Sequence, residues 1–196
     1  MITLCMDTSH VFLALGIIRD DAVIASFQEP CWKKQSEMIF PQLIGMMEKN
    51  GLSPADIDAV VISSGPGSYT GVRIAMTIAK VFCSMRDVPL YTVPTLLLYG
   101  GKEDCRVVLD ARGKRSYTAR CTDGRIVGEQ QVLYNAELPQ DAPAMIGDLH
   151  LFGQEDRWPD LIQNFLALKD AWKPAENVHL VTPDYLKDSD AYMVKK

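Results

Sequence analysis

Short apolar runs separated by polar turns fill the beginning of the chain and predict a set of β-strands. Residues 2–7, 11–18 and 22–27 form three such runs, and polar residues 19–21 make a turn between the second and the third. A further run, Ala59–Ser63, is almost continuously apolar. That composition is typical of a strand buried on both faces of a sheet.

Helical spacing appears between these strands, over residues 34–50. The apolar residues that share one face there are Ile39, Leu43, Met46 and Met47. Pro41 lies inside the pattern and is expected to start or kink the helix, because proline lacks the backbone N–H that an interior helical residue donates. Asn50-Gly51 supplies a stop signal at the end.

A second helical pattern, residues 71–85, is unusual in how few polar positions it has. They form one narrow stripe, made of Arg73, Thr77, Lys80 and Ser84. Since a surface helix normally has a broad polar face, this helix is predicted to be covered on two sides. One cover is its own sheet, and the other is a neighbouring helix or a partner protein.

The second half of the chain begins like the first. An apolar run ends in Asp110 as the first run ends in Asp7, and in each half a second strand, an acidic turn and a third short strand follow. Two hairpins of one design favour a duplicated ribonuclease-H-like unit, the α/β plan of actin, Hsp70 and the sugar kinases, with subdomains at 1–100 and 101–196. The alternative is chance similarity of two hairpins.

The remainder of the second half is less regular. Residues 144–148 and 178–183 have the composition of strands, and residues 157–173 contain a helix around Pro159.

Composition restricts the partners. The net charge of −5 over 196 residues gives no whole-surface attraction for nucleic acid. The candidates for a local basic patch are Arg112, Lys114, Arg115 and Arg120. The alternative for these residues is an ordinary solvated hairpin.

Five cysteines without a CxxC pair argue against a disulfide framework or a zinc ribbon. A reducing cytoplasmic location is expected, since no signal peptide is recognised and no apolar run is long enough to span a membrane.

The glycine-rich loop at residues 63–73 matches neither common phosphate motif. Gly71 is not followed by the lysine of a P-loop, and Thr70 stands where a dinucleotide fingerprint needs its third glycine. Ser68 or Thr70 can cap the following helix. A tight connection is the main interpretation, and anion binding at the helix N-terminus is the alternative.

Candidate catalytic chemistry is sparse. Asp7 and Asp110 stand where an actin-like enzyme places carboxylates for magnesium, but neither is followed by a glycine-rich turn. The three histidines, His10, His150 and His179, have no metal-ligand spacing. No metal site or cofactor is expected.

Several segments together resemble the TsaB (YeaZ) family of bacterial proteins for making threonylcarbamoyladenosine in tRNA. The central segment "SSGPGSYTGVRIAMTIAK" carries the resemblance most specifically. The segments "LCMDTS", "QSEMIFPQLIGMM", "VVLDARGKRSYTARC" and "TPDYLK" extend it. The match is good over about 1–122 and thin over the rest.

The resemblance implies a non-catalytic scaffold with the actin/Hsp70-like (ASKHA) fold. Such a subunit pairs with TsaD, which transfers threonylcarbamoyl to adenosine 37 of tRNA, and the ATPase TsaE joins the pair. A homodimer is implied for the protein alone, with tRNA contacted only indirectly. Gln35 stands where many relatives have histidine.

Under this interpretation the partner interface is predicted on the first two helices. Its expected residues are Phe40, Met47, Tyr69, Val72, Arg73, Met76 and Lys80. A degenerate nucleotide site is expected at Asp7, Ser9 and Asp110. Two alternatives stay open, an independent actin-like ATPase or kinase using Asp7 and Asp110, and a peptidase, for which a histidine cluster is missing.

Overall fold

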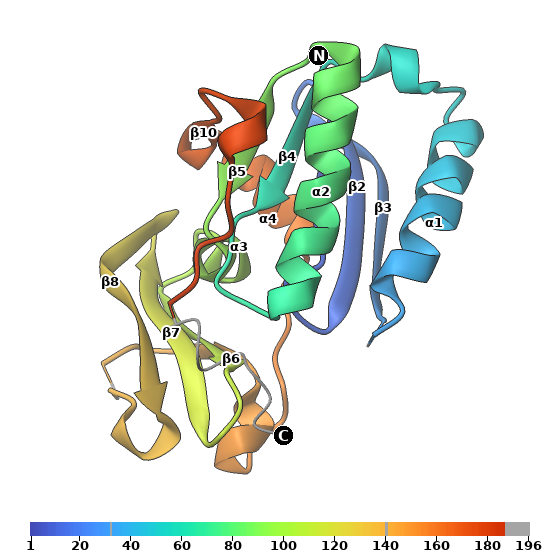
Figure 1. The fold of residues 1–196 in the computed structure, drawn as a ribbon. Helices are drawn as coiled ribbons and strands as arrows, with labels where there is room; N and C mark the ends of the chain where they lie inside the picture. Colours follow the sequence, from blue (N-terminus) through green and yellow to red (C-terminus); the bar gives the residue numbers. More distant parts are fainter. Residues whose placement is uncertain (32, 140, 187–196) are drawn as a thin grey trace.

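The computed structural model describes residues 1–31, 33–139 and 141–186, and two mixed β-sheets form its framework (Figure 1). The first sheet has the order β10-β5-β4-β1-β2-β3. Its strands are β1 (Ile2–Asp7), β2 (Phe12–Arg19), β3 (Ala22–Pro30), β4 (Ala59–Ser63), β5 (Leu90–Val93) and β10 (Lys173–Pro174). The first three strands pair antiparallel, β4 is parallel to β1, and β5 is parallel to β4.

The second sheet repeats the beginning of this plan with the order β8-β7-β6-β9. Its strands are β6 (Cys105–Asp110), β7 (Arg115–Thr122), β8 (Arg125–Tyr134) and β9 (Met145–Gly147). Again three strands pair antiparallel, and a fourth, β9, lies parallel to the first. The repeated hairpin predicted from Asp7 and Asp110 is therefore confirmed, as is the duplicated α/β fold class.

Helices cover both faces of the first sheet. Helices α1 (Gln35–Lys49) and α2 (Tyr69–Arg86) pack on the face formed by Leu4 and Met6 of β1. The opposite face, with Cys5, packs against α3 (Thr95–Gly100) and α4 (Leu161–Ala167). Because α3 also contacts β6 and β7, this second core is continuous between the two sheets.

One expected element is wrong, and the place of one expected residue is now known. Pro41, expected to start or kink helix α1, lies inside it, since the helix begins at Gln35. The apolar packing of Ile39 and Leu43 offsets the hydrogen bond that Pro41 cannot donate. Residues 178–180 form a 3₁₀ turn, and the expected strand over 178–183 is absent from that described stretch. Short 3₁₀ segments in the described residues are Pro54–Asp56, Asn135–Glu137, Leu149–Phe152, Lys169–Ala171 and Val178–Leu180.

Residues 177–186, here the C-terminal segment, return along helix α2. Lys80 Nζ donates to the carbonyl oxygen of Val181 (2.9 Å), and the ring of Tyr185 stacks on that of Tyr69 with 5.3 Å between centroids. Part of the second cover expected over this helix is thus supplied by the chain itself. Lys187, the last residue of the "TPDYLK" motif, lies outside the described residues. The domain boundary at residue 100 stays a prediction.

The glycine-rich loop brings the start of α2 against the turn after β1. Ser68 caps the helix, with its hydroxyl accepting from the Gly71 N–H (3.3 Å). Thr8 Oγ1 donates to the Gly71 carbonyl (2.6 Å) and accepts from the Ala75 N–H (3.1 Å). A side chain at Gly67 would collide with the Ser9 carbonyl oxygen, so this position requires glycine for close approach.

All five cysteines are buried and free, as expected of small apolar side chains. Within the described ranges, every helix is too short or too polar to cross a lipid bilayer.

The close approach at Gly67 is testable by substitution. We expect Gly67→Ala to lower the free energy of unfolding by about 1–3 kcal/mol, since the new methyl group forces backbone apart. The matched control is Gly45→Ala in α1, where nothing lies within 4 Å of the added carbon. That change should stabilise the protein by about 0.5–1 kcal/mol. Urea unfolding of both variants measures the difference, and equal effects would contradict the packing role.

Candidate functional site

The end of strand β1 carries a carboxylate that is completely enclosed. Asp7 is fully buried, and its Oδ1 accepts hydrogen bonds from the Ser63 hydroxyl and from the Ser9 N–H (3.2 Å). Its Oδ2 accepts from the Tyr99 hydroxyl (3.4 Å). Strands β1 and β4, the β1–β2 turn and helix α3 therefore all meet at one side chain.

Burial raises the pKa of Asp7 above its ordinary range, because the charged form loses its hydration. The hydrogen bonds from Ser63 and Ser9 and the nearby His10 act in the opposite direction, without reversing the shift. A magnesium ligand at neutral pH needs an ionised, accessible oxygen. The oxygens of Asp7 instead accept hydrogen bonds from other residues of the chain and are not accessible to an ion.

A second buried pair links the two sheets. His10 Nε2 lies 2.8 Å from Asp148 Oδ2, and both side chains are less than a tenth exposed. The same carboxylate oxygen accepts the backbone N–H of Asp110 (2.6 Å). Burial raises the pKa of Asp148, but His10 and the Asp110 N–H outweigh that effect and hold it below its usual value.

Aromatic rings close the space around His10. Its ring centroid lies 5.6 Å from that of Trp158 and 6.2 Å from that of Tyr99. Phe12 packs against Trp158 edge to face at 5.2 Å. Gln35, at the start of α1, is also buried there and donates from Nε2 to the His10 carbonyl (3.0 Å).

The three residues expected to form a degenerate nucleotide site have different roles here. Asp7 and Ser9 hydrogen-bond to each other, and Ser9 itself is buried. Asp110 joins the same cluster through its backbone N–H, whereas its Oδ1 accepts the N–H of Arg112 (2.7 Å) in the following turn. Asp148, Tyr99 and Trp158 complete the cluster, and no local spacing in the sequence pointed to them.

Among the described residues, one group has metal-ligand proximity. Ligand atoms of Asp148, His150 and Asp156 lie within 4.8 Å of one another. His150 Nδ1 is 2.8 Å from Asp156 Oδ1, and this contact raises the pKa of the imidazole. The two ion pairs, His150 with Asp156 and His10 with Asp148, explain why these three side chains lie close together.

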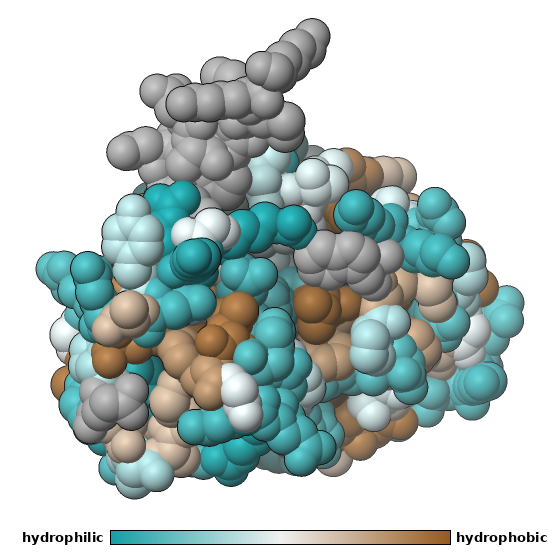
Figure 2. All heavy atoms as spheres, turned by 90° about the horizontal axis from the view of Figure 1, so that it is seen from below, coloured by the Kyte–Doolittle hydropathy of each residue, from teal (hydrophilic) through white to brown (hydrophobic). Residues whose placement is uncertain are grey.

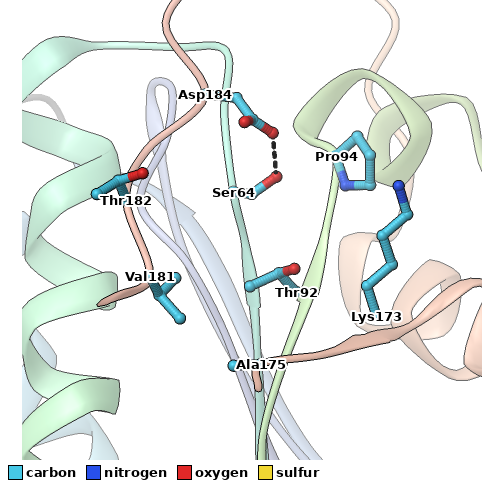
Figure 3. Close-up of a pocket in the computed structure, with 8 residues that line it drawn as sticks. All are labelled: Ser64, Thr92, Pro94, Lys173, Ala175, Val181, Thr182 and Asp184. Carbon is cyan, nitrogen blue, oxygen red and sulfur yellow. Dashed lines mark hydrogen bonds between the residues drawn. The ribbon is translucent and has the colours of Figure 1, made fainter. Parts of the chain in front are cut away.

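A pocket of about 280 Å³ opens beside the ends of the parallel strands β4 and β5 (Figure 3). Ser64 and Asp184 lie together at one end, joined by a hydrogen bond of 2.9 Å. Lys173 lies beside Pro94. The C-terminal segment forms one wall, so the pocket depends on that segment staying in place.

The expected interface residues divide into three groups. Met47, Val72 and Met76 lie in the hydrophobic core and face the sheet. Phe40 and Tyr69 are exposed. Arg73 and Lys80 contact the C-terminal segment.

The contacts of Arg73 are specific. Its Nε donates to the Tyr185 hydroxyl (2.7 Å), and its guanidinium carbon lies 4.1 Å from the centre of the Tyr69 ring. Helical spacing marks which side chains share a stripe, but it does not identify which distant segment covers that stripe.

Two pairs of exposed apolar side chains lie on the same two helices, and of these four residues only Phe40 was predicted as part of the interface. Phe40 and Ile44 are 53% and 54% exposed on α1, and Val81 and Met85 are 55% and 81% exposed on α2. A groove of about 420 Å³ runs beside the second pair. It is lined by Thr77, Lys80, Val81, Ser84, Met85 and His179.

The burial of Asp7 predicts a pH effect on stability. A group whose pKa is raised on folding binds its proton more tightly in the native state, so stability falls as pH rises above the unfolded value of 3.8. Asp7→Asn keeps an acceptor for Ser63 and Ser9 but cannot ionise. We therefore expect the stability of the native protein relative to Asp7→Asn to fall between pH 4 and neutrality. Urea unfolding across that range measures it, and parallel curves would contradict the buried-carboxylate account.

Comparison with known proteins assigns the family. The family model described as TsaD, tRNA N6-adenosine threonylcarbamoyltransferase, matches residues 29–138, more than half of the chain. A curated relative from Bacillus subtilis, the tRNA threonylcarbamoyladenosine biosynthesis protein TsaB, is 27% identical over 97% of this chain and 96% of its own. The TsaB protein of Escherichia coli is 33% identical over 48% of this chain and 40% of its own.

Solved structures agree on the fold. A Pseudomonas aeruginosa protein described as similar to peptidase YEAZ superimposes with a TM-score of 0.80, covering 95% of this chain and 99% of its own at 19% identity. YeaZ from the same organism gives a TM-score of 0.74 at 19% identity, over 94% of this chain and 99% of its own. At this identity the likeness speaks for the fold alone, and the expected actin/Hsp70-like class is confirmed. The chain belongs to the TsaD family and, within it, to the TsaB (YeaZ) group.

Proposed function

We propose that this protein is a scaffold subunit of the apparatus that makes threonylcarbamoyladenosine in tRNA, without catalysis of its own. In this role it pairs with a TsaD-like paralogue, and the pair recruits a TsaE-like ATPase. The names of the TsaB relatives support the pathway, and the family model supports descent from a transferase fold.

The observation that carries the proposal is the exposed apolar surface of helices α1 and α2. Two pairs of large apolar side chains, Phe40 with Ile44 and Val81 with Met85, are each more than half exposed. The two helices lie on the same face of the first sheet (Figure 1). The two members of each pair are one helical turn apart and so lie side by side on their helix, and local apolar patches of this kind are typical of protein-interaction surfaces.

This surface differs in part from the predicted interface. A partner cannot reach Met47, Val72 or Met76 without opening the core, so their contribution is to hold the two helices in position. Phe40 and Tyr69 are retained, and Ile44, Val81 and Met85 are added. A helix pair from the partner would complete a contact of the usual size for a stable complex, roughly 1,200–2,000 Å² in total.

The state of the two aspartates supports a scaffold over an independent ATPase or kinase. The oxygens of Asp7 are occupied by Ser63, Ser9 and Tyr99, and one oxygen of Asp110 is occupied by a turn N–H. Magnesium bound for phosphate chemistry requires carboxylate oxygens that are open to the ion.

The proposal is tested with one substitution made at two places. We expect Val81→Asp to weaken binding to the TsaD protein of the same organism by at least about tenfold, or 1.4 kcal/mol, because a charge would be buried in an apolar contact. The matched control is Val127→Asp on β8, where the valine is 53% exposed against 55% for Val81. Titration calorimetry with both variants supplies the measurement.

Size-exclusion chromatography with light scattering then separates the possible outcomes. A mixed dimer that Val81→Asp disrupts and Val127→Asp does not would support the scaffold and its surface. If the unmodified chain ignores TsaD at all concentrations, the pairing is wrong. If both variants bind as the native chain does, the partner uses another face.

A further inference from the structure

The turn between β6 and β7 is a basic element that the proposed function does not use. Residues 112, 113 and 114 all have positive φ, at 61°, 66° and 58°. This succession of left-handed conformations makes a sharply folded tip with exposed side chains. The tip carries Arg112 and Lys114, and Arg115 follows at the first position of β7.

The neighbouring arginines of the same sheet are paired with carboxylates, and in this they differ from the cations of the turn. Arg106 makes a two-pronged contact with Asp141, at 2.8 Å for both nitrogens, and Arg120 pairs with Asp104. In contrast, the side chains of Lys114 and Arg115 form no hydrogen bond or ion pair with other residues in the described part of the chain. Their charges are therefore available to an anionic partner.

The acidic groups near the turn are largely engaged elsewhere. Asp148 contacts His10, and Asp156 contacts His150. Asp110 accepts the backbone N–H of Arg112. The turn is thus a locally positive point on a protein whose net charge is −5.

An exposed aromatic ring lies directly beside these cations. Tyr134, at the end of β8, is the ladder partner of Arg115 and is 56% exposed. The next residue is fixed to the turn, since the Asn135 N–H donates to the Lys114 carbonyl oxygen (2.9 Å). Figure 2 shows the molecule from below in the orientation of Figure 1, and that face is mostly hydrophilic with apolar side chains in separate patches.

We propose that the β6–β7 turn and Tyr134 form a contact site for RNA. Lys114 and Arg115 would neutralise backbone phosphates, and the Tyr134 ring would stack on an unpaired base. This pairing of cations with an exposed ring matches the chemistry of single-stranded RNA loops. The choice of tRNA as the RNA rests on the proposed function, and direct contact replaces the expected indirect role.

The first experiment compares two double variants that change net charge equally. Lys114→Glu/Arg115→Glu reverses the turn, and Lys102→Glu/Arg125→Glu reverses two exposed cations near the β7–β8 turn, at the opposite end of that strand pair. Binding of an unmodified tRNA transcript is followed by fluorescence anisotropy between about 50 and 200 mM salt. It is measured on the chain alone and on its complex with TsaD.

We expect the turn variant to weaken tRNA binding at least about tenfold and to reduce the salt slope by about two, since two phosphate contacts are lost. The control pair should stay close to the native chain. Tyr134→Ala should weaken binding without changing the salt slope, and Tyr134→Trp should restore it, because only stacking is altered.

Three results would overturn the proposal. They are no tRNA binding that depends on the turn in either preparation, equal losses in both double variants, or equal affinity for duplex DNA of similar length. The last result would mean general attraction of polyanions. TsaD binding by the same variants is measured separately, so failure of the RNA site and failure of the scaffold are distinguishable.

Discussion

The buried polar side chains of Asp7, His10 and Asp148, here called the polar seam, are the constraint on which the arrangement of the two sheets depends. Asp7 ties β1 to β4 through Ser63 and to α3 through Tyr99, and His10 ties the adjacent turn to the second sheet through Asp148. Such groups are costly to bury unless each finds a partner. Since their partners come from β4, from α3 and from the residue that follows β9, the seam is satisfied only when both sheets and α3 are in register.

The sequence predicted the elements of this seam better than the seam itself. The two hairpins ending in Asp7 and Asp110 could be found because strand alternation and acidic turns are local signals. The burial of Asp7 was not visible, since Ser63 and Tyr99 lie 56 and 92 positions away. Asp148 lacked any signal because its role comes from contacts with His10 and the Asp110 N–H across the two sheets.

Helix α2 also shows that local sequence patterns do not identify long-range contacts. Its narrow polar stripe predicted correctly that more than the sheet covers it, because a helix with few polar positions cannot leave a broad face in water. The sequence left open whether the second cover is a neighbouring helix or a partner protein. Part of that cover is the chain's own C-terminal segment, which contacts the helix through Val181 and Tyr185. That segment has little periodicity, so only the folded structure reveals where it packs.

The glycine-rich loop connects these observations. Its glycines bring the start of α2 against Thr8 and Ser9, in the turn that carries the seam residue His10. Any widening there would separate Asp7 and His10 from their partners. A closed seam supports fixed positions for α1 and α2, and helices held in fixed positions lose little entropy when a partner binds their exposed side chains. Rigid packing at this end of the fold therefore favours affinity at its outer surface.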